Sequence, residues 1–267
     1  VINDCGALER ISDLPGLLSL DIESCMAIKT MADLHKLKTL NIKKCSGIER
    51  ISGRPTFSVR SEGLPKLEKL QIELCSSLKV VEGLENLTKI YTEYCDSLEE
   101  IARVPKLSIA SFHKCSSLVS LPPKHSLKEL YMSGCTSVAR LGDMPLLTSL
   151  IAIAADSLVK IGDMPLLTEL ILSSGLLKKI GRLDSLEQID MNGCGALKSL
   201  PDMPKLATAA INSCDSLETI GNIPSVTSLR LTRLNSFKTI GMQEPIKSTL
   251  ESILINTCNS LEALPML

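Results

Sequence analysis

One arrangement of apolar and polar positions recurs along the chain. Its first copy runs from Cys5 to Cys25, with Pro15 after the third of six aliphatic side chains, which are Leu8, Ile11, Leu14, Leu17, Leu20 and Ile22. The copy that begins at Cys194 repeats this order. Apolar positions that recur at a fixed spacing build a stack of similar coils, because each coil buries its apolar side against the next. The pattern therefore predicts one repeat solenoid over residues 1–267.

The cysteines mark the spacing of this repeat. They stand at positions 5, 25, 45, 75, 95, 115, 135, 194, 214 and 258. If Ala155, Gly175 and Leu234 replace cysteine in three copies, the chain has thirteen such positions, and nine of the twelve intervals are 20 residues long. We expect about thirteen coils, a loop insertion at 52–63, a smaller insertion at 242–248, and one missing residue between Gly175 and Cys194.

Each repeat contains one alternating segment. Leu20-Asp21-Ile22-Glu23 is typical, and its period of two predicts a half-buried β-strand. The other eight or so residues of a repeat are too few for an ordinary helix, so an extended segment or a short 3-10 turn is expected there. Pairs of amphipathic helices need roughly 34 to 45 residues per repeat, which excludes them. We predict a mostly β solenoid of the α/β repeat class with a parallel sheet.

The composition and the net charge indicate which residues form the core and which classes of partner are not favoured. Of its residues 44% are hydrophobic, yet only three are Phe, three are Tyr and none is Trp, so Leu and Ile must form the core. The net charge is −1, from 29 basic and 30 acidic residues, which favours neither nucleic acid nor an anionic membrane. Its apolar runs are far shorter than the roughly 20 residues that span a bilayer. Because the sequence begins within a strand pattern, we expect a fragment of a longer multidomain protein.

The cysteines raise the question of disulfides, metal or catalysis. Neighbouring repeats would bring them about 4.8 Å apart with parallel side chains, a poor direction for a disulfide, although disulfides remain the alternative. Reduced, buried thiols favour an intracellular, cytoplasmic location. The three histidines, His35, His113 and His125, are scattered and give no metal-ligand spacing. We therefore predict no catalytic site, no cofactor and no metal.

The side chains that alternate with the core along each strand form a candidate binding surface. In the first repeats they are charged or polar, and toward the middle of the chain they become aromatic and apolar. Clustered apolar side chains on a surface usually mark an interaction site. The candidate partner-binding residues are Tyr91, Tyr94, His113, Tyr131, Ile151, Ile153 and Ile171. In the alternative register these isoleucines point inward, and Ala152, Ala154 and Ala155 point outward.

The motif Leu17-x-x-Leu20-x-Ile22-x-x-Cys25 resembles leucine-rich repeats of the cysteine-bearing type. Stretches such as GLPKLEKLQIELCSSLK and SLKELYMSGCTSVARL are similar to the repeat region of plant intracellular nucleotide-binding leucine-rich-repeat (NLR) immune receptors. The resemblance covers the whole chain and implies a horseshoe with its parallel sheet on the concave face. It also implies a role in plant innate immunity, in which this region recognises a pathogen effector or a host protein and restrains neighbouring domains of the parent chain.

Other protein-binding roles share this scaffold, because a fold does not define a function. Secreted bacterial leucine-rich-repeat effectors also use a 20-residue unit, although they usually carry asparagine where cysteine stands here. The substrate-recognition domain of a ubiquitin ligase and a generic scaffold are further alternatives.

Overall fold

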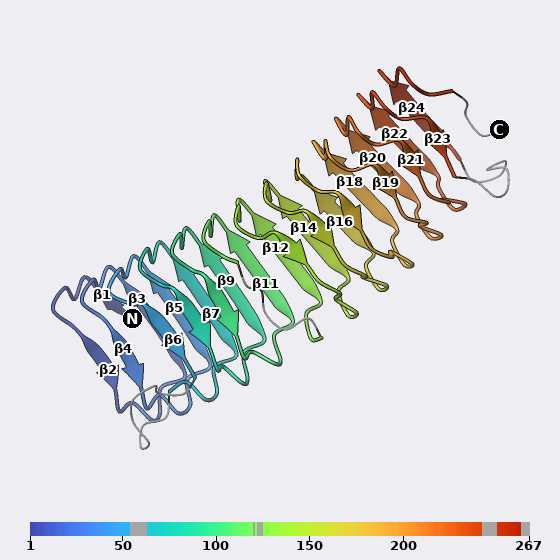
Figure 1. Ribbon diagram of the computed structural model, residues 1–267. Coiled ribbons are helices and arrows are strands. Elements are labelled where there is room, and N and C mark those ends of the chain that lie inside the picture. Colours follow the sequence, from blue (N-terminus) through green and yellow to red (C-terminus); the bar gives the residue numbers. More distant parts are fainter. Residues whose placement is uncertain (54–62, 120, 122–124, 242–249, 263–267) are drawn as a thin grey trace. The chain divides into compact units, whose positions relative to one another are not determined.

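The computed structural model describes residues 1–53, 63–119, 121, 125–241 and 250–262 (Figure 1). These residues form strands and turns and contain no helix. No segment of the described chain is therefore a helix that could cross a membrane. The chain divides into two units: unit 1 contains 1–127 and 134–137, and unit 2 contains 128–133 and 138–267.

Unit 1 contains a parallel sheet of long strands and, on the other side of each coil, shorter strands. The long strands are β3 (Ser19–Glu23), β5 (Thr39–Lys43), β7 (Lys69–Glu73), β9 (Lys89–Glu93) and β11 (Ile109–His113), and the two-residue strand β1 (Ile2–Asn3) forms the edge of the same sheet. The short strands are β2 (Arg10–Ser12), β4 (Thr30–Ala32), β6 (Arg50–Ser52), β8 (Val80–Glu82) and β10 (Glu100–Ala102).

Unit 2 repeats this arrangement with shorter strands on the second side. Its long strands are β12 (Glu129–Ser133), β14 (Ser149–Ile153), β16 (Glu169–Leu172), β18 (Gln188–Asn192), β20 (Thr208–Asn212), β22 (Ser228–Thr232) and β24 (Ser252–Asn256). Its short strands are β13 (Arg140–Leu141), β15 (Lys160–Ile161), β17 (Lys179–Ile180), β19 (Ser199–Leu200), β21 (Thr219–Ile220) and β23 (Thr239–Ile240). The predicted mostly β, parallel solenoid is confirmed, with about twelve turns of about 20 residues.

Equivalent positions of successive repeats pair in the sheet, and this pairing continues between the repeats that flank the insertions. Ile22 pairs with Ile42, and Ile42 pairs with Ile72 although 30 residues separate them. Leu231 pairs with Ile255 across the second long interval. The insertions themselves, predicted at 52–63 and 242–248, lie for the most part outside the described residues. The extra residues therefore leave the pairing of the flanking coils unchanged.

Two β-turns close each coil. One begins at the cysteine position, as in the bond from the amide of Leu8 to the carbonyl of Cys5 (3.1 Å). The other begins at the apolar residue before proline, as in the bond from the amide of Leu17 to the carbonyl of Leu14 (3.1 Å). Pro15 takes the second position of that turn, where its fixed φ is favourable and its missing N–H costs no hydrogen bond. The predicted extended return path is thus a short strand between two turns.

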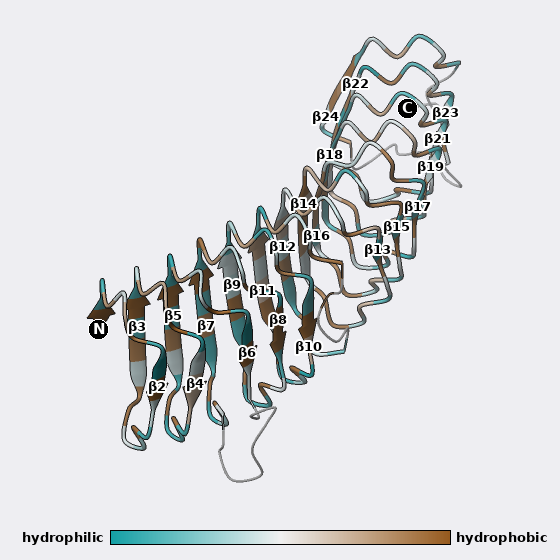
Figure 2. Ribbon diagram, turned by 60° about the vertical axis from the view of Figure 1, so that its left-hand side comes forward, coloured by the Kyte–Doolittle hydropathy of each residue, from teal (hydrophilic) through white to brown (hydrophobic). Residues whose placement is uncertain are grey.

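The core lies between the long and the short strands. Along β3, Leu20 and Ile22 are buried while the intervening side chains reach the surface, as the alternation predicts. Figure 2 shows apolar segments that recur at similar places in successive long strands. The largest fully buried side chains are mostly Leu and Ile, with Phe112 and Phe237 as the exceptions. Identical aliphatic layers therefore account for most of the core.

Cysteine is a core position of the repeat, as expected. Eight of the ten cysteines are buried, and Cys5 and Cys258 lie in the outermost coils. The thiols donate to carbonyls at the end of the preceding strand, for example from Cys45 Sγ to the oxygen of Lys43 (3.3 Å) and from Cys75 Sγ to that of Glu73 (3.5 Å). The thiol thus fills a small apolar space and satisfies a strand-end carbonyl.

The prediction that Gly175 occupies the cysteine position of its repeat is wrong. Ser174, not Gly175, fills it: Ser174 is 1% exposed, its Oγ donates to the carbonyl of Leu158 (2.9 Å), and its own carbonyl starts the turn to Leu177. The missing residue therefore lies before this position, where β16 is one residue shorter than its neighbours. Sequence counting failed here because two adjacent small residues, Ser174 and Gly175, fit the pattern equally well.

Candidate partner-binding surfaces

A sharp bend follows almost every long strand. Twelve of the thirteen residues that stand directly before the cysteine position have a positive φ, and ten of these are not glycine. Left-handed backbone conformations are uncommon for residues with a side chain, so the repeat imposes them. In successive coils of unit 1 this bend carries Leu74, Tyr94 and Lys114, with φ between 50° and 55°. Their side chains consequently lie at one edge of the sheet.

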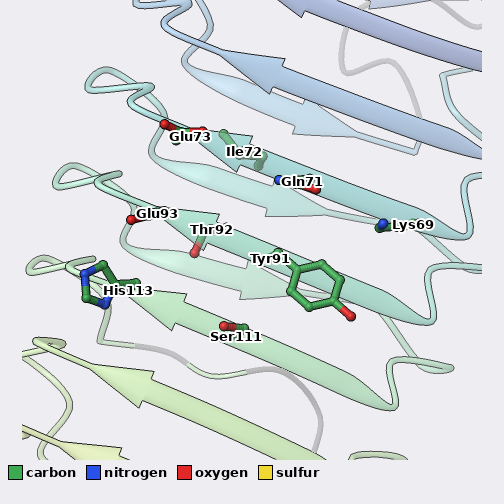
Figure 3. A pocket seen from close by; sticks show the side chains of 9 residues that line it. All are labelled: Lys69, Gln71, Ile72, Glu73, Tyr91, Thr92, Glu93, Ser111 and His113. Atoms are coloured by element: carbon green, nitrogen blue, oxygen red, sulfur yellow. The ribbon is translucent and has the colours of Figure 1, made fainter.

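The outward side chains of β7, β9 and β11 line a shallow depression of about 320 Å³ (Figure 3). Gln71, Tyr91 and Ser111 form one row across these three strands, since the register pairs them in sequence. Glu73, Glu93 and His113 form a second row at the strand ends. Tyr91 is the largest side chain of the first row, and Lys69 Nζ lies 5.6 Å from the centre of its ring.

Two ion pairs join neighbouring coils on this side of unit 1. Lys43 Nζ lies 3.0 Å from Glu73 Oε1, and Lys44 Nζ lies 3.6 Å from Glu23 Oε1. The hydrogen bond to Glu73 and the negative charge of that carboxylate raise the pKa of Lys43. Ion pairs this exposed contribute little to folding. Their main effect is to cancel the local charge.

An aromatic cluster stands at the edge of the depression. The rings of Tyr94 and His113 meet edge to face with their centres 5.5 Å apart, and Lys114 Nζ lies 4.8 Å from the centre of the Tyr94 ring. Leu74, in the preceding coil, is 39% exposed beside this cluster and was not predicted as a surface residue. We call Leu74, Tyr91, Tyr94 and His113 the aromatic surface.

A second apolar group lies on the sheet of unit 2. Tyr131 pairs with Ile151, and Ile151 pairs with Ile171, so these three side chains form one row across β12, β14 and β16. Ile153 lies at the end of β14 and is 39% exposed, Tyr131 is 37% exposed, and the other two are half-buried. We call Tyr131, Ile151, Ile153 and Ile171 the isoleucine surface.

The register of β14 decides between the two sequence interpretations. Ala152 and Ala155 are completely buried, together with Leu150, and Ile151 and Ile153 face outward. The alternative with inward isoleucines is therefore wrong. The seven candidate residues divide between the units: Tyr91, Tyr94 and His113 belong to unit 1, and the remaining four belong to unit 2. Their role in binding a partner stays a prediction.

Four of the buried thiols have an environment that disfavours the reactive thiolate. Burial raises the pKa of Cys75 and of Cys95 to about 12, and it also raises the pKa of Cys45 and Cys115. A thiolate is the reactive form, so these groups are inert near neutral pH. Within the described ranges no three His, Cys, Asp or Glu side chains gather as metal ligands would.

The geometry of each coil agrees with the repeat motif of the sequence. A parallel strand recurs in every turn, the leucines and isoleucines of the motif face the core, and the cysteine position closes the strand end. The chain's own geometry therefore defines a parallel β solenoid with about 20 residues per coil.

No protein-family model and no curated protein matches the chain. Three solved structures are similar to it. A leucine-rich cell surface protein from Faecalibacterium prausnitzii is 14% identical over 76% of this chain and 90% of its own, with a TM-score of 0.33. The pneumococcal vaccine antigen PcpA is 18% identical over 91% and 74%, with a TM-score of 0.29. A leucine-rich repeat protein from Bacteroides ovatus is 16% identical over 99% and 82%, also with a TM-score of 0.29.

Proposed function

We propose that this chain is a non-enzymatic protein-recognition module and that the isoleucine surface is its main contact. One observation carries the proposal: Tyr131, Ile151, Ile153 and Ile171 adjoin one another on a sheet that otherwise presents mostly polar side chains. The repeat does not need them there, since the same outward positions are Asp21 and Glu23 in β3. Exposed, adjoining apolar side chains are stabilised by a partner that removes them from water.

A finer proposal concerns the parent protein of this module and its cellular compartment. We propose that it is the ligand-sensing and autoinhibitory repeat region of a cytoplasmic plant immune receptor of the NLR type. The cysteine-bearing repeats, such as Leu127-x-x-Leu130-x-Met132-x-x-Cys135, support this setting through their resemblance to that family. Thiols that donate to carbonyls inside the core support a reducing compartment. Its partner would be a pathogen effector, a host protein or a neighbouring domain.

Charged substitutions in the middle of the isoleucine surface test whether it binds a partner. The double substitution Ile151→Glu and Ile171→Glu should abolish partner binding, because it removes two apolar contacts and places two hydrated carboxylates where the apolar side chains of the partner pack. The measurement is affinity capture from plant tissue with cross-links mapped to peptides. Partners that bind the parent chain should form cross-links to β12–β16 and should be absent from the variant.

Leu146→Glu with Leu166→Glu is the matched control. Both leucines are exposed at the turns of the same unit, and neither lies in a strand. The control should retain the partners, and both variants should keep the circular dichroism spectrum of the parent chain. Capture of the same proteins by all three chains would show that the isoleucine surface binds nothing.

The reducing compartment is tested separately by the state of the thiols. Mass measurement after rapid alkylation under denaturing conditions should find all ten cysteines of the natural protein reduced, and alkylation of the folded protein should modify mainly Cys5 and Cys258. These two are the cysteines that are not buried. Several disulfides in the natural protein would contradict the cytoplasmic location.

A further inference from the structure

The outward positions around the isoleucine surface carry charges of one sign. The first outward positions of β12, β14, β16 and β18 are Glu129, Ser149, Glu169 and Gln188, and the next are Tyr131, Ile151, Ile171 and Asp190. Ser133, Ile153 and Asn192 complete these strands. Their outward positions thus contain three acids and no base, and Arg230 in β22 is the first base in an outward position farther along unit 2.

These three acids differ from Glu23 and Glu73 of unit 1. There, Glu23 and Glu73 form ion pairs with lysines of neighbouring coils. No ion pair to Glu129, Glu169 or Asp190 occurs among the described residues. Glu169 accepts a hydrogen bond from Ser149 Oγ (2.8 Å), a neutral donor that orients the carboxylate over β14 and leaves its charge uncompensated.

The spacing of the sheet places this charge beside the apolar row. Neighbouring strands lie about 4.8 Å apart, and alternate residues of one strand lie roughly 7 Å apart. Ser149, which holds the Glu169 carboxylate, is two residues before Ile151 on β14. At the other end of the row, Asp190 pairs directly with Ile171. A group bound on the isoleucines is thus within reach of acids on two sides.

We propose that the partner of the isoleucine surface is a protein segment that combines apolar side chains with Lys or Arg. This inference rests on the proposed function and adds the chemistry of the partner. The apolar side chains of the segment cover Tyr131, Ile151 and Ile171, and its cations approach Glu129, Glu169 and Asp190. An acidic segment would bring like charges together as water is excluded, so the same surface rejects it.

The first experiment selects partners without assuming one. A phage library of random 12-residue peptides is selected on the immobilised chain and depleted on the variant with Ile151→Glu and Ile171→Glu. That variant is more acidic than the parent chain, so it removes peptides that bind through charge alone. The surviving peptides should contain apolar residues and carry a net positive charge.

The two proposals fail in different ways in this selection. If the surviving peptides are neutral or acidic, the isoleucine surface still binds protein but its partner is not basic, and the further inference is overturned. If no peptide distinguishes the parent chain from the variant, the surface is not a recognition site and the proposed function fails with it.

The second experiment measures the acids directly with one selected peptide. Neutralisation of the three acids by Glu129→Gln, Glu169→Gln and Asp190→Asn should weaken binding about tenfold at low salt and reduce its salt dependence. The matched control is Asp156→Asn, Asp184→Asn and Asp215→Asn, which removes three exposed acids of unit 2 that lie outside the strands. The control should bind almost as tightly as the parent chain. Equal weakening in both variants would show that only net charge matters and would overturn the inference.

Discussion

Replacement of Gly162 by alanine is expected to lower the free energy of unfolding by about 3 kcal/mol. A Cβ at this position would lie 2.6 Å from the carbonyl carbon of Gly142 and 2.6 Å from the amide nitrogen of Asp143. Both atoms belong to the backbone of the preceding coil, so no side-chain rotation can make room. The coils would have to separate and strain the bond from the amide of Gly162 to the carbonyl of Leu141 (2.9 Å). Chemical denaturation followed by circular dichroism measures the loss.

Gly195→Ala is the matched control for this prediction. Gly195 lies in the same unit, has no positive φ, and a Cβ there would have no heavy atom within 4 Å. The control should be as stable as the parent chain or slightly more stable, because alanine restricts the unfolded chain. Equal stability of the two variants would mean that adjacent coils do not pack as closely at Gly162 as the structure shows.

Raising the pH from 8 to 10 is expected to cost about 3 kcal/mol of folding free energy through Cys75 and Cys95 alone. In the folded chain burial raises the pKa of both thiols from 9.0 to about 12. The unfolded chain releases these protons near pH 9, whereas the folded chain retains them. The stabilisation is therefore complete below pH 9, and it is lost as the pH rises from 9 to 12. Each thiol accounts for about 1.4 kcal/mol at pH 10.

The double variant Cys75→Ala with Cys95→Ala isolates this contribution. Alanine suits the position, because Ala155 fills it naturally and is completely buried. The variant should be less stable than the parent chain at pH 7, but its stability should fall by about 3 kcal/mol less between pH 8 and pH 10. Cys5→Ala, which removes an exposed thiol, should leave the parent's pH dependence unchanged. Parallel pH curves for the parent and the double variant would contradict the burial of these thiols.

Most of the fold could be predicted from spacing alone. The 20-residue interval between cysteine positions predicts which residues pair in the parallel sheet. Leu20 pairs with Leu40 and Ile22 pairs with Ile42, as this interval requires. This works because stacked coils bury equivalent positions against each other, so an error of one residue would expose a whole layer. Ser174 shows the limit of the method. Where a strand is one residue shorter, the sequence does not show which of two neighbouring small residues occupies the cysteine position. The hydrogen bonds of the turn identify it.

The candidate surfaces could be predicted only in part. Alternation identified Ile151 and Ile153 as outward, since their neighbours Leu150 and Ala152 fit the core. Leu74 was missed because it stands after its strand, at a residue whose left-handed φ directs the chain to the edge of the sheet. The edge-to-face contact of Tyr94 with His113 also joins adjacent coils, and periodicity does not specify such contacts.

The repeat pattern determined the class of fold, the coil length, the core and the outward positions, because all of these depend on burial at regular intervals. The three-dimensional arrangement decided which charges are cancelled. Glu73 and Lys43, 30 residues apart, form an ion pair, whereas Glu129, Glu169 and Asp190 form none with any residue that the structure describes. The physical reason is that electrostatic pairing depends on side-chain distances between coils, which a pattern of apolar and polar residues leaves open.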